Sequence, residues 1–235
     1  MSQQTVLKKL QKSVEKMETK LAKKAAQEAV EMQISPVVAI EKGLAKGMKT
    51  ISDRFDEGEV FVPHLLVAAD AFETAVNVLT ESMSREDKER TVLGKILIHT
   101  VKGDIHDIGK NIALTMLSAN GFKVFDLGRD VPAEEVVEKA KELKVDIIVG
   151  AALMTTTLPS QKDIINLLNE EGIREQFKVI FGGSPVSADW VKKIGADGYA
   201  DSATEVVALA KTLIAAKNRN ANLMQMSKGD IKRRR

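Results

Sequence analysis

The stretch KILIHTVKGDIHDIGKNIALTMLSANGFKVFDLG, residues 95–128, decides the fold. It begins with a β-rich run at residues 95–100 and passes through a polar loop into a helical segment that opens after Gly109. A second β-rich run follows at residues 123–126. Short β-rich runs separated by a helical segment of roughly 10–15 residues are typical of a β-α-β unit with parallel strands.

The same alternation continues to about residue 217. Further β-rich runs lie at residues 146–150 and 178–181, with a weaker run near Gly198-Tyr199. Helical segments open after Pro132, Pro159, Pro185 and Asp201. Five such units predict a flavodoxin-like domain over residues 91–217, with a five-stranded parallel sheet covered by helices on both faces. Ligands of such sheets bind beyond the carboxyl ends of the strands.

Upstream of this domain the periodicity is that of helices. Apolar residues recur three or four positions apart in three stripes: Val6, Leu10, Val14, Met17 and Leu21; Val37, Ile40, Leu44, Met48, Ile51 and Phe55; Leu65, Ala69, Phe72, Val76 and Leu79. The pattern predicts a bundle of three or four helices over residues 1–90, in which residues 3–33 form one long helix or two. The polar run SREDKERT at residues 84–91 separates the bundle from the α/β domain, so the predicted fold class is α + α/β.

Composition excludes several classes of function. A net charge of +2 and an aromatic content of 4% argue against nucleic acid as a partner. The absence of cysteine excludes disulfides, thiolate zinc sites and iron–sulfur clusters. The N-terminus lacks the apolar core of a signal peptide, and no apolar run approaches the roughly 20 residues of a membrane span, so we expect a cytoplasmic protein. Residues 218–235 show no periodicity and end in a basic run, which predicts a disordered tail.

The polar loop after the first strand carries the candidate chemistry. It matches neither the phosphate-binding G-x-x-x-x-G-K-[ST] nor the dinucleotide-binding G-x-G-x-x-G pattern. It places Asp104 two residues before His106, and Gly109 three residues after it. Neutral imidazole is a good ligand for a transition metal, and a carboxylate on its other ring nitrogen selects the tautomer. Gly109 leaves room for a bulky ligand. The alternative is that His106 caps a helix or lies in a solvated loop.

The spacing Asp104-x-His106-x-x-Gly109 is the D-x-H-x-x-G signature of cobalamin-binding domains, and further segments resemble the same family. Residues 154–157, MTTT, follow the third strand, and Gly182-Gly183 follow the fourth. Residues 61–71, FVPHLLVAADA, resemble the helical cap of small methyltransferase corrinoid proteins. The chain therefore resembles the corrinoid methyl carriers over most of its length, and most of all those of the trimethylamine, dimethylamine and monomethylamine systems.

The resemblance implies a cobalamin or related corrinoid as cofactor, with His106 replacing the cofactor's own lower base as the cobalt ligand. It implies that Asp104 hydrogen-bonds to His106 and that Thr157 extends this relay. The cleft for the displaced nucleotide tail is then lined by Gly109, Thr155, Gly182 and Gly183. Ala151 stands where many members have a serine, so the contacts with the tail are expected to differ.

The function that the resemblance implies is methyl transfer in methylamine metabolism and methanogenesis. The chain would accept a methyl group on Co(I) from a substrate-specific methyltransferase, with trimethylamine as the first choice of donor. It would deliver the group to a second methyltransferase that acts on a thiol or a pterin. A reductive activation protein is a further implied partner, and the chain itself would be a non-catalytic carrier.

Several alternatives remain open. Methanol, glycine betaine or aryl methyl ethers could replace methylamines as donors. A cobalamin-dependent sensor would share both domains, but no DNA-binding module is visible outside them. A phosphoacceptor receiver domain would need an aspartate at the end of the third strand, where this chain has Gly150.

Other candidate residues are expected to be structural. His64 is predicted to be a polar residue at a helix end, and His99 to be buried and hydrogen-bonded. Asp126 and Asp130 are predicted to serve in turns and caps, with contacts to the corrin amides as the alternative. Most of the apolar residues Met48, Phe55, Phe61 and Phe72 are predicted to be core, although one or two of them could cover the methyl face of the corrin.

Overall fold

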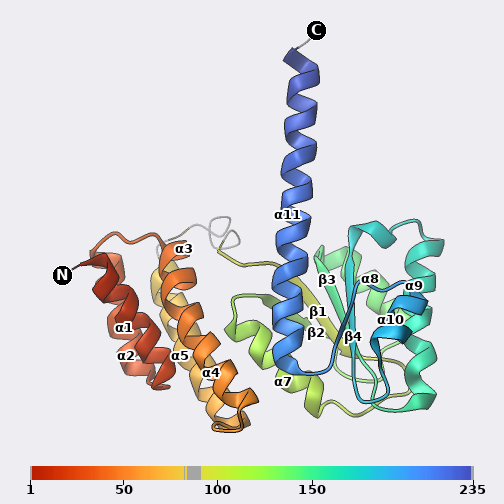
Figure 1. Ribbon diagram of the computed structural model, residues 1–235, viewed down its shortest axis with the longest axis horizontal. Coiled ribbons are helices and arrows are strands. Elements are labelled where there is room, and N and C mark those ends of the chain that lie inside the picture. Colours follow the sequence, from red (N-terminus) through yellow and green to blue (C-terminus); the bar gives the residue numbers. More distant parts are fainter. Residues whose placement is uncertain (1, 82, 84–90, 234–235) are drawn as a thin grey trace.

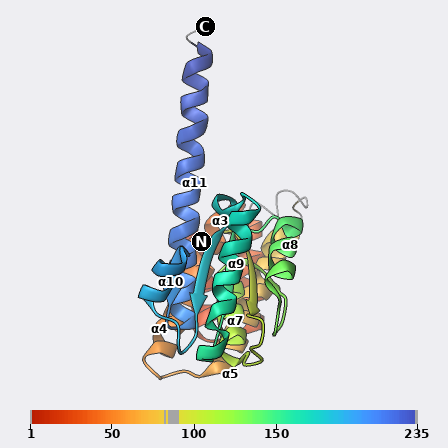
Figure 2. The same ribbon diagram turned by 90° about the vertical axis from the view of Figure 1, so that its right-hand side faces the viewer.

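The computed structural model describes residues 2–81, 83 and 91–233, and beyond residue 217 it describes a side-chain position for Arg219 alone. Figure 1 shows the helical domain and the α/β domain side by side, with the last helix, α11 (Ala203–Arg233), rising between them. The side view in Figure 2 shows α11 projecting well past the rest of the molecule. The predicted linker at residues 84–91 lies outside the described residues except for Thr91.

The helical domain contains the predicted bundle. Its elements are α1 (Gln3–Glu15), α2 (Thr19–Glu31), α3 (Pro36–Ala39), the π-helical turn η1 (Ile40–Leu44), α4 (Ala45–Asp56) and α5 (Val62–Thr80). Residues 3–33 thus form two helices, because Met17 takes a left-handed conformation with φ 58° that breaks the helical path. Gly58, with φ 75°, turns the chain after α4.

Two glycines bring α1 close to η1 and α4. A Cβ on Gly47 would lie 2.4 Å from the carbonyl oxygen of Gln11, and one on Gly43 would lie 3.0 Å from the Cβ of Leu10. Only residues without a side chain allow this close approach of the two backbones. The apolar stripe of α1 is buried there, with Val6, Leu10 and Val14 fully inaccessible.

Helix α5 is the most apolar helix of the bundle. Among the described residues it alone is long and apolar enough to cross a membrane, with 19 residues and a mean hydropathy of 1.2. It is interrupted by Asp70 and Glu73, and it packs against α2 within the bundle and against α7 of the α/β domain. These contacts are those of a core helix, and a core helix can be as long and as apolar as a membrane-spanning one.

The α/β domain is built on five parallel strands. They are β1 (Lys95–Thr100), β2 (Lys123–Asp126), β3 (Ile147–Ala151), β4 (Lys178–Gly182) and β5 (Gly198–Ala200), in the order β2-β1-β3-β4-β5. Every predicted strand is confirmed to within one residue at each end. This strand order is that of the flavodoxin-like doubly wound fold, which confirms the predicted fold class.

Helices cover both faces of the sheet, and Figure 1 shows the strands between α7 and α11 on one side and α9 and α10 on the other. One face carries α7 (Ile108–Ala119) and the first part of α11, and the other carries α8 (Ala133–Leu143), α9 (Leu158–Glu170) and α10 (Ala188–Ile194). The central strand β3 is buried on both faces, because Ile147 and Val149 face one core and Ile148 faces the other. A two-sided core explains why the strands are short continuous apolar runs.

The two domains share an apolar core and polar contacts. Phe72 and Leu79 of α5 belong to the same buried cluster as Met116 of α7. The hydroxyl of Thr204, at the start of α11, donates a hydrogen bond to Oδ1 of Asp56 at the end of α4 over 2.7 Å. The contact places the α4–α5 turn at the edge of the sheet where β5 ends.

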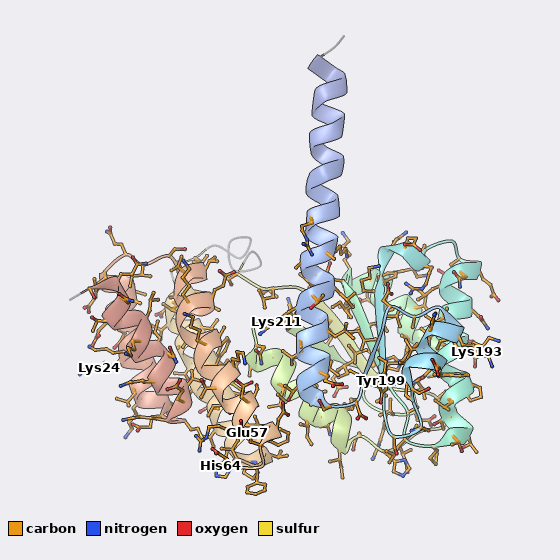
Figure 3. All side chains as sticks on the ribbon, viewed as in Figure 1. Lys24, Glu57, His64, Lys193, Tyr199 and Lys211 are labelled. Atoms are coloured by element: carbon orange, nitrogen blue, oxygen red, sulfur yellow. The ribbon has the colours of Figure 1, made fainter. Side chains whose placement is uncertain are left out.

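Helix α11 differs from the prediction for the C-terminal segment. The tail expected to be disordered from residue 218 is instead helical as far as Arg233. The helix is anchored in the α/β domain by Val206, Ala210 and Ile214, which are buried. Lys211, labelled in Figure 3, also donates to the side-chain oxygen of Asn120 over 2.7 Å. The residues that follow include good helix formers and no proline, so a helix nucleated by packing can extend.

Candidate functional site

The carboxyl ends of β1, β3 and β4 open on a cavity of about 430 Å³. Its walls are largely apolar, and Ile98, Val149 and Val206 contribute to them. The predicted residues that line it are His106, Gly109, Gly182 and Gly183, together with Ala151. A cavity at the carboxyl edge of the strands is where a doubly wound domain binds its ligand.

Asp104 is the centre of the polar network beside this cavity. Its Oδ1 accepts hydrogen bonds from the backbone N–H of His106 over 3.0 Å and lies 2.9 Å from His106 Nδ1. Its Oδ2 accepts from the backbone N–H of Leu153 over 2.7 Å and from the hydroxyl of Thr157 over 2.9 Å. Asp104 is fully buried, so these donors replace the water that its carboxylate would otherwise bind. The predicted Asp104–His106 and Asp104–Thr157 contacts are both confirmed.

The hydrogen bonds determine the charge of Asp104. Burial alone would raise the pKa of this carboxyl, but bonds from the backbone N–H groups of Leu153 and His106 and from the side chains of His106 and Thr157 lower the pKa to about 2. Asp104 is therefore an ionised carboxylate at neutral pH and can only accept. It follows that the proton of neutral His106 is on Nδ1 and the lone pair is on Nε2.

His106 can therefore bind a metal through Nε2. Its side chain is 46% exposed, and among the described residues none makes a hydrogen bond to Nε2. Within the same described ranges no three His, Asp or Glu side chains gather closely enough to hold a bare metal ion. A single protein ligand suits a metal whose other ligands come from an organic cofactor.

Exposed apolar side chains surround His106. Ile105 is 60% exposed, Ile108 is 78% exposed and Leu153 is 48% exposed. Large apolar residues gathered at the mouth of a cavity indicate a surface that a ligand covers. These residues were not predicted from the sequence, although Ile105 and Ile108 alternate with the polar residues of the motif.

Glycines shape the inner wall of the cavity. Gly183 has φ 119°, and a Cβ there would lie 1.8 Å from the carbonyl oxygen of Ala152. A Cβ on Gly182 would lie 2.7 Å from the carbonyl oxygen of Ala200. A Cβ on Gly109 would have no neighbour within 4 Å, so the glycine leaves open space beside His106. The predicted glycines thus either permit close backbone packing or leave room for a ligand.

Thr155 and His99 have surroundings that the sequence alone does not reveal. Thr155 begins the exposed 3-10 turn η2 (Thr155–Thr157), in which only Thr157 turns inward, so its contact with the nucleotide tail stays a prediction. His99 is buried as expected, but within the described part of the chain neither of its ring nitrogens has a hydrogen-bond partner. Burial, reinforced by the charge of Lys110, lowers the pKa of His99 to about 3, so its ring is neutral.

The outcomes for the remaining candidate residues are mixed. His64, at the lower end of the helical domain in Figure 3, serves as a helix cap, since its Nδ1 accepts from the backbone N–H of Phe61 over 3.0 Å. Of the four apolar residues expected to be mostly core, Met48 and Phe72 are buried, whereas Phe61 is 62% exposed. The predicted turn roles of Asp126 and Asp130 are confirmed, because they accept hydrogen bonds from the backbone N–H groups of Gly128 and Gly103.

Comparison with known proteins identifies the family. Residues 94–208 match the family model described as B12 binding domain, and residues 6–80 match a second model with the same description. The chain is 51% identical over 183 residues to dimethylamine corrinoid protein 1 of Methanosarcina acetivorans, which covers 78% of this chain and 85% of that relative. The chain belongs to the corrinoid proteins.

This corrinoid protein has other close relatives. It is 48% identical over 186 residues to trimethylamine corrinoid protein 1 of Methanosarcina acetivorans, covering 79% of this chain and 86% of the relative. Among solved structures, the methanol:cobalamin methyltransferase complex of Methanosarcina barkeri matches with a TM-score of 0.76 and 33% identity, over 91% of this chain and 81% of the matched chain. The predicted resemblance is therefore confirmed.

The corrinoid protein takes cobalamin or a related corrinoid as its cofactor. The geometry fits such a group in three respects. His106 offers one free ring nitrogen, the exposed apolar side chains around it suit the flat ring, and the glycine-lined cavity beside it can take an organic tail.

Proposed function

We propose that this corrinoid protein is the methyl carrier of a methylamine methyltransferase system. It accepts a methyl group from a substrate-specific methyltransferase and delivers it to a second methyltransferase. The observation that carries the proposal is His106, a single histidine whose Nδ1 proton is held by Asp104 and whose Nε2 is free beside the cavity. The 51% and 48% identities to dimethylamine and trimethylamine corrinoid proteins support the choice of system.

Each residue of the site has a distinct part in the proposal. His106 binds the cobalt through Nε2, and Asp104 with Thr157 keeps the proton on Nδ1. Gly182 and Gly183 pack closely against the backbone of Ala200 and Ala152, which leaves the cavity open for the nucleotide tail of the cofactor. When bound, the corrinoid supplies a cobalt centre that in its Co(I) state is a strong nucleophile for a methyl group.

The helical domain is proposed as a movable cover for this edge of the sheet. The Thr204–Asp56 hydrogen bond joins the end of α4 to the first turn of α11, and Ser202 and Ala203, just before Thr204, line the cavity. The α4–α5 turn, with the exposed Phe61, therefore lies at the edge where the cofactor binds. A cover that excludes water between transfers must open when a partner enzyme docks.

The methyl donor and the partners are the finer part of the proposal. We propose trimethylamine as the first choice of donor, and identities of 51% and 48% do not separate dimethylamine from trimethylamine. A second methyltransferase and a reductive activation protein complete the proposed set of partners, in the cytoplasm. The chain itself is proposed not to catalyse transfer of the methyl group from the amine, since the partner enzyme activates the amine leaving group.

The experiment is a methylation assay with matched enzymes. The reduced holo-protein is mixed with trimethylamine and its methyltransferase, with dimethylamine and its methyltransferase, or with methanol and its methyltransferase. One of the two methylamine pairs should convert the reduced spectrum to that of the methylated protein, because docking is specific to matched surfaces. His106→Ala should slow this conversion while the apo-protein unfolds at the same temperature.

Two results would contradict the proposal. Conversion by a methylamine without any enzyme would make the chain a methyltransferase in its own right. Conversion by the methanol enzyme alone would leave the carrier role in place and exclude the methylamine assignment.

A further inference from the structure

The loop that carries Asp104 and His106 is held by two residues outside it. The backbone N–H of Gly103 donates to Oδ1 of Asp130 over 2.6 Å. The backbone N–H of Asp130 donates to the carbonyl oxygen of Asp104 over 3.0 Å. The hydroxyl of Thr100 donates to the same carbonyl oxygen over 2.5 Å and accepts a hydrogen bond from the backbone N–H of Asp130 over 3.0 Å.

These bonds anchor three successive peptide units around Asp104. The unit before Gly103 and the unit after Asp104 are bound to Asp130 and Thr100. The unit between them is closed by a bond from the N–H of Asp104 to the carbonyl oxygen of Val101 over 3.0 Å. With its backbone bonded on both sides, Asp104 has little freedom to change the direction of its Cα–Cβ bond.

Asp130, which bonds to the loop of Asp104, has an uncommon backbone conformation. Its φ of 58° lies in the left-handed region, which costs a residue with a side chain about 1 kcal/mol or more. Aspartate tolerates the region when its side chain makes a local hydrogen bond, and here it points both its N–H and its carboxylate at the loop of Asp104. Thr100 is fully buried at the end of β1, so the strand fixes the position of its backbone and the surrounding core restricts its side chain.

We propose that Thr100 and Asp130 are positioning residues, which orient the carboxylate of Asp104 and through it the ring of His106. Neither residue lines the cavity, so their effect on the cofactor passes through Asp104. The inference rests on the proposed ligation of cobalt by His106. A ring whose direction is set before the cofactor arrives loses less entropy when it binds, which strengthens ligation.

The test measures how easily an outside ligand displaces His106 from cobalt. Holo-protein labelled with ¹⁵N-histidine is reduced to Co(II) and titrated with ordinary imidazole, and electron paramagnetic resonance distinguishes the two nitrogens. Thr100→Val removes the hydroxyl and keeps the shape. Asp130→Gly removes the carboxylate and keeps the left-handed backbone, while Asp130→Asn keeps both the backbone and an acceptor oxygen.

We expect Asp130→Gly to lower the imidazole concentration at half-displacement about five-fold, which corresponds to about 1 kcal/mol for one lost hydrogen bond. Thr100→Val removes two hydrogen bonds and should lower it by at least as much. Asp130→Asn should behave as the wild type. Thr80→Val is the matched control, because Thr80 is also buried and its hydroxyl donates to the carbonyl oxygen of Val76 over 2.9 Å in helix α5. This control should leave the displacement unchanged.

Unchanged displacement in both Thr100→Val and Asp130→Gly would overturn the positioning role, as would an equal shift in Thr80→Val. Asp130 is exposed, so Asp130→Gly decides the matter if Thr100→Val does not fold. A wild-type Co(II) signal without histidine nitrogen would be a different failure, since it would overturn the proposed ligation by His106 itself.

Discussion

Asp104→Asn separates the charge of Asp104 from its shape. Both carboxylate oxygens accept hydrogen bonds in the structure: Oδ1 from the backbone and ring of His106, and Oδ2 from Leu153 and Thr157. Asparagine keeps one acceptor oxygen and replaces the other with an NH₂ donor. The buried NH₂ must therefore face at least one N–H group that donates to a carboxylate oxygen of Asp104 in the wild type.

The cost follows from the two orientations of the amide. With NH₂ in place of Oδ2, it opposes the N–H of Leu153 at a site where the carboxylate bond is 2.7 Å long. With NH₂ in place of Oδ1, it opposes the N–H of His106 and forces Nδ1 to become an acceptor. The ring proton then moves to Nε2, which removes the lone pair that would bind cobalt. In the first orientation the unsatisfied buried donor costs about 1–3 kcal/mol of stability. In the second, loss of the partner of the ligating histidine costs about 10–100-fold in ligation.

The assay is the Co(II) spectrum of holo-protein labelled with ¹⁵N-histidine, together with thermal unfolding of the apo-protein. Asp104→Asn should lose most of the histidine signal and unfold at a lower temperature. Asp163→Asn, at an exposed position on α9, is the matched control and should change neither quantity. Full histidine ligation together with an unchanged unfolding temperature in Asp104→Asn would refute the reasoning, because each orientation of the amide must either change the tautomer of His106 or leave a buried N–H of Leu153 without an acceptor.

Two further perturbations test the cavity and the core. Gly183→Ala would bring a Cβ to 1.8 Å from the carbonyl oxygen of Ala152, so we expect a lower unfolding temperature and weaker retention of the corrinoid on gel filtration; wild-type retention would contradict the assigned cavity. His99 has a pKa of about 3 when folded against 6.5 when unfolded, so its full contribution to stability is present above pH 6.5. Between pH 6.5 and pH 3 only the unfolded chain binds this proton, and the free energy of unfolding should fall by about 1.4 kcal/mol per pH unit. His99→Leu should remove that part of the slope in urea unfolding from pH 7 to pH 4.5, and an unchanged slope would show that His99 does not cause it.

The sequence by itself determined the order of the elements and the polar pair at the centre of the site. Strand ends were predicted to within one residue, because each strand is a short apolar run bounded by polar residues and glycine. The Asp104–His106 contact could be predicted because the two residues are only two positions apart. The role of Thr157 came from the family resemblance alone, since it is 53 positions from Asp104.

Only the tertiary structure decided which residues meet across larger separations. It paired Thr100 with Asp130, placed Thr155 on the surface and Thr157 inside, and left the ring of His99 without hydrogen-bond partners among the described residues. It also joined α5 to α7 in one core, although the apolar stripe of each helix reveals only that it is buried and not what covers it. Periodicity records which face of an element avoids water, whereas partners depend on how the sheet and its helices assemble, and no local pattern carries that information.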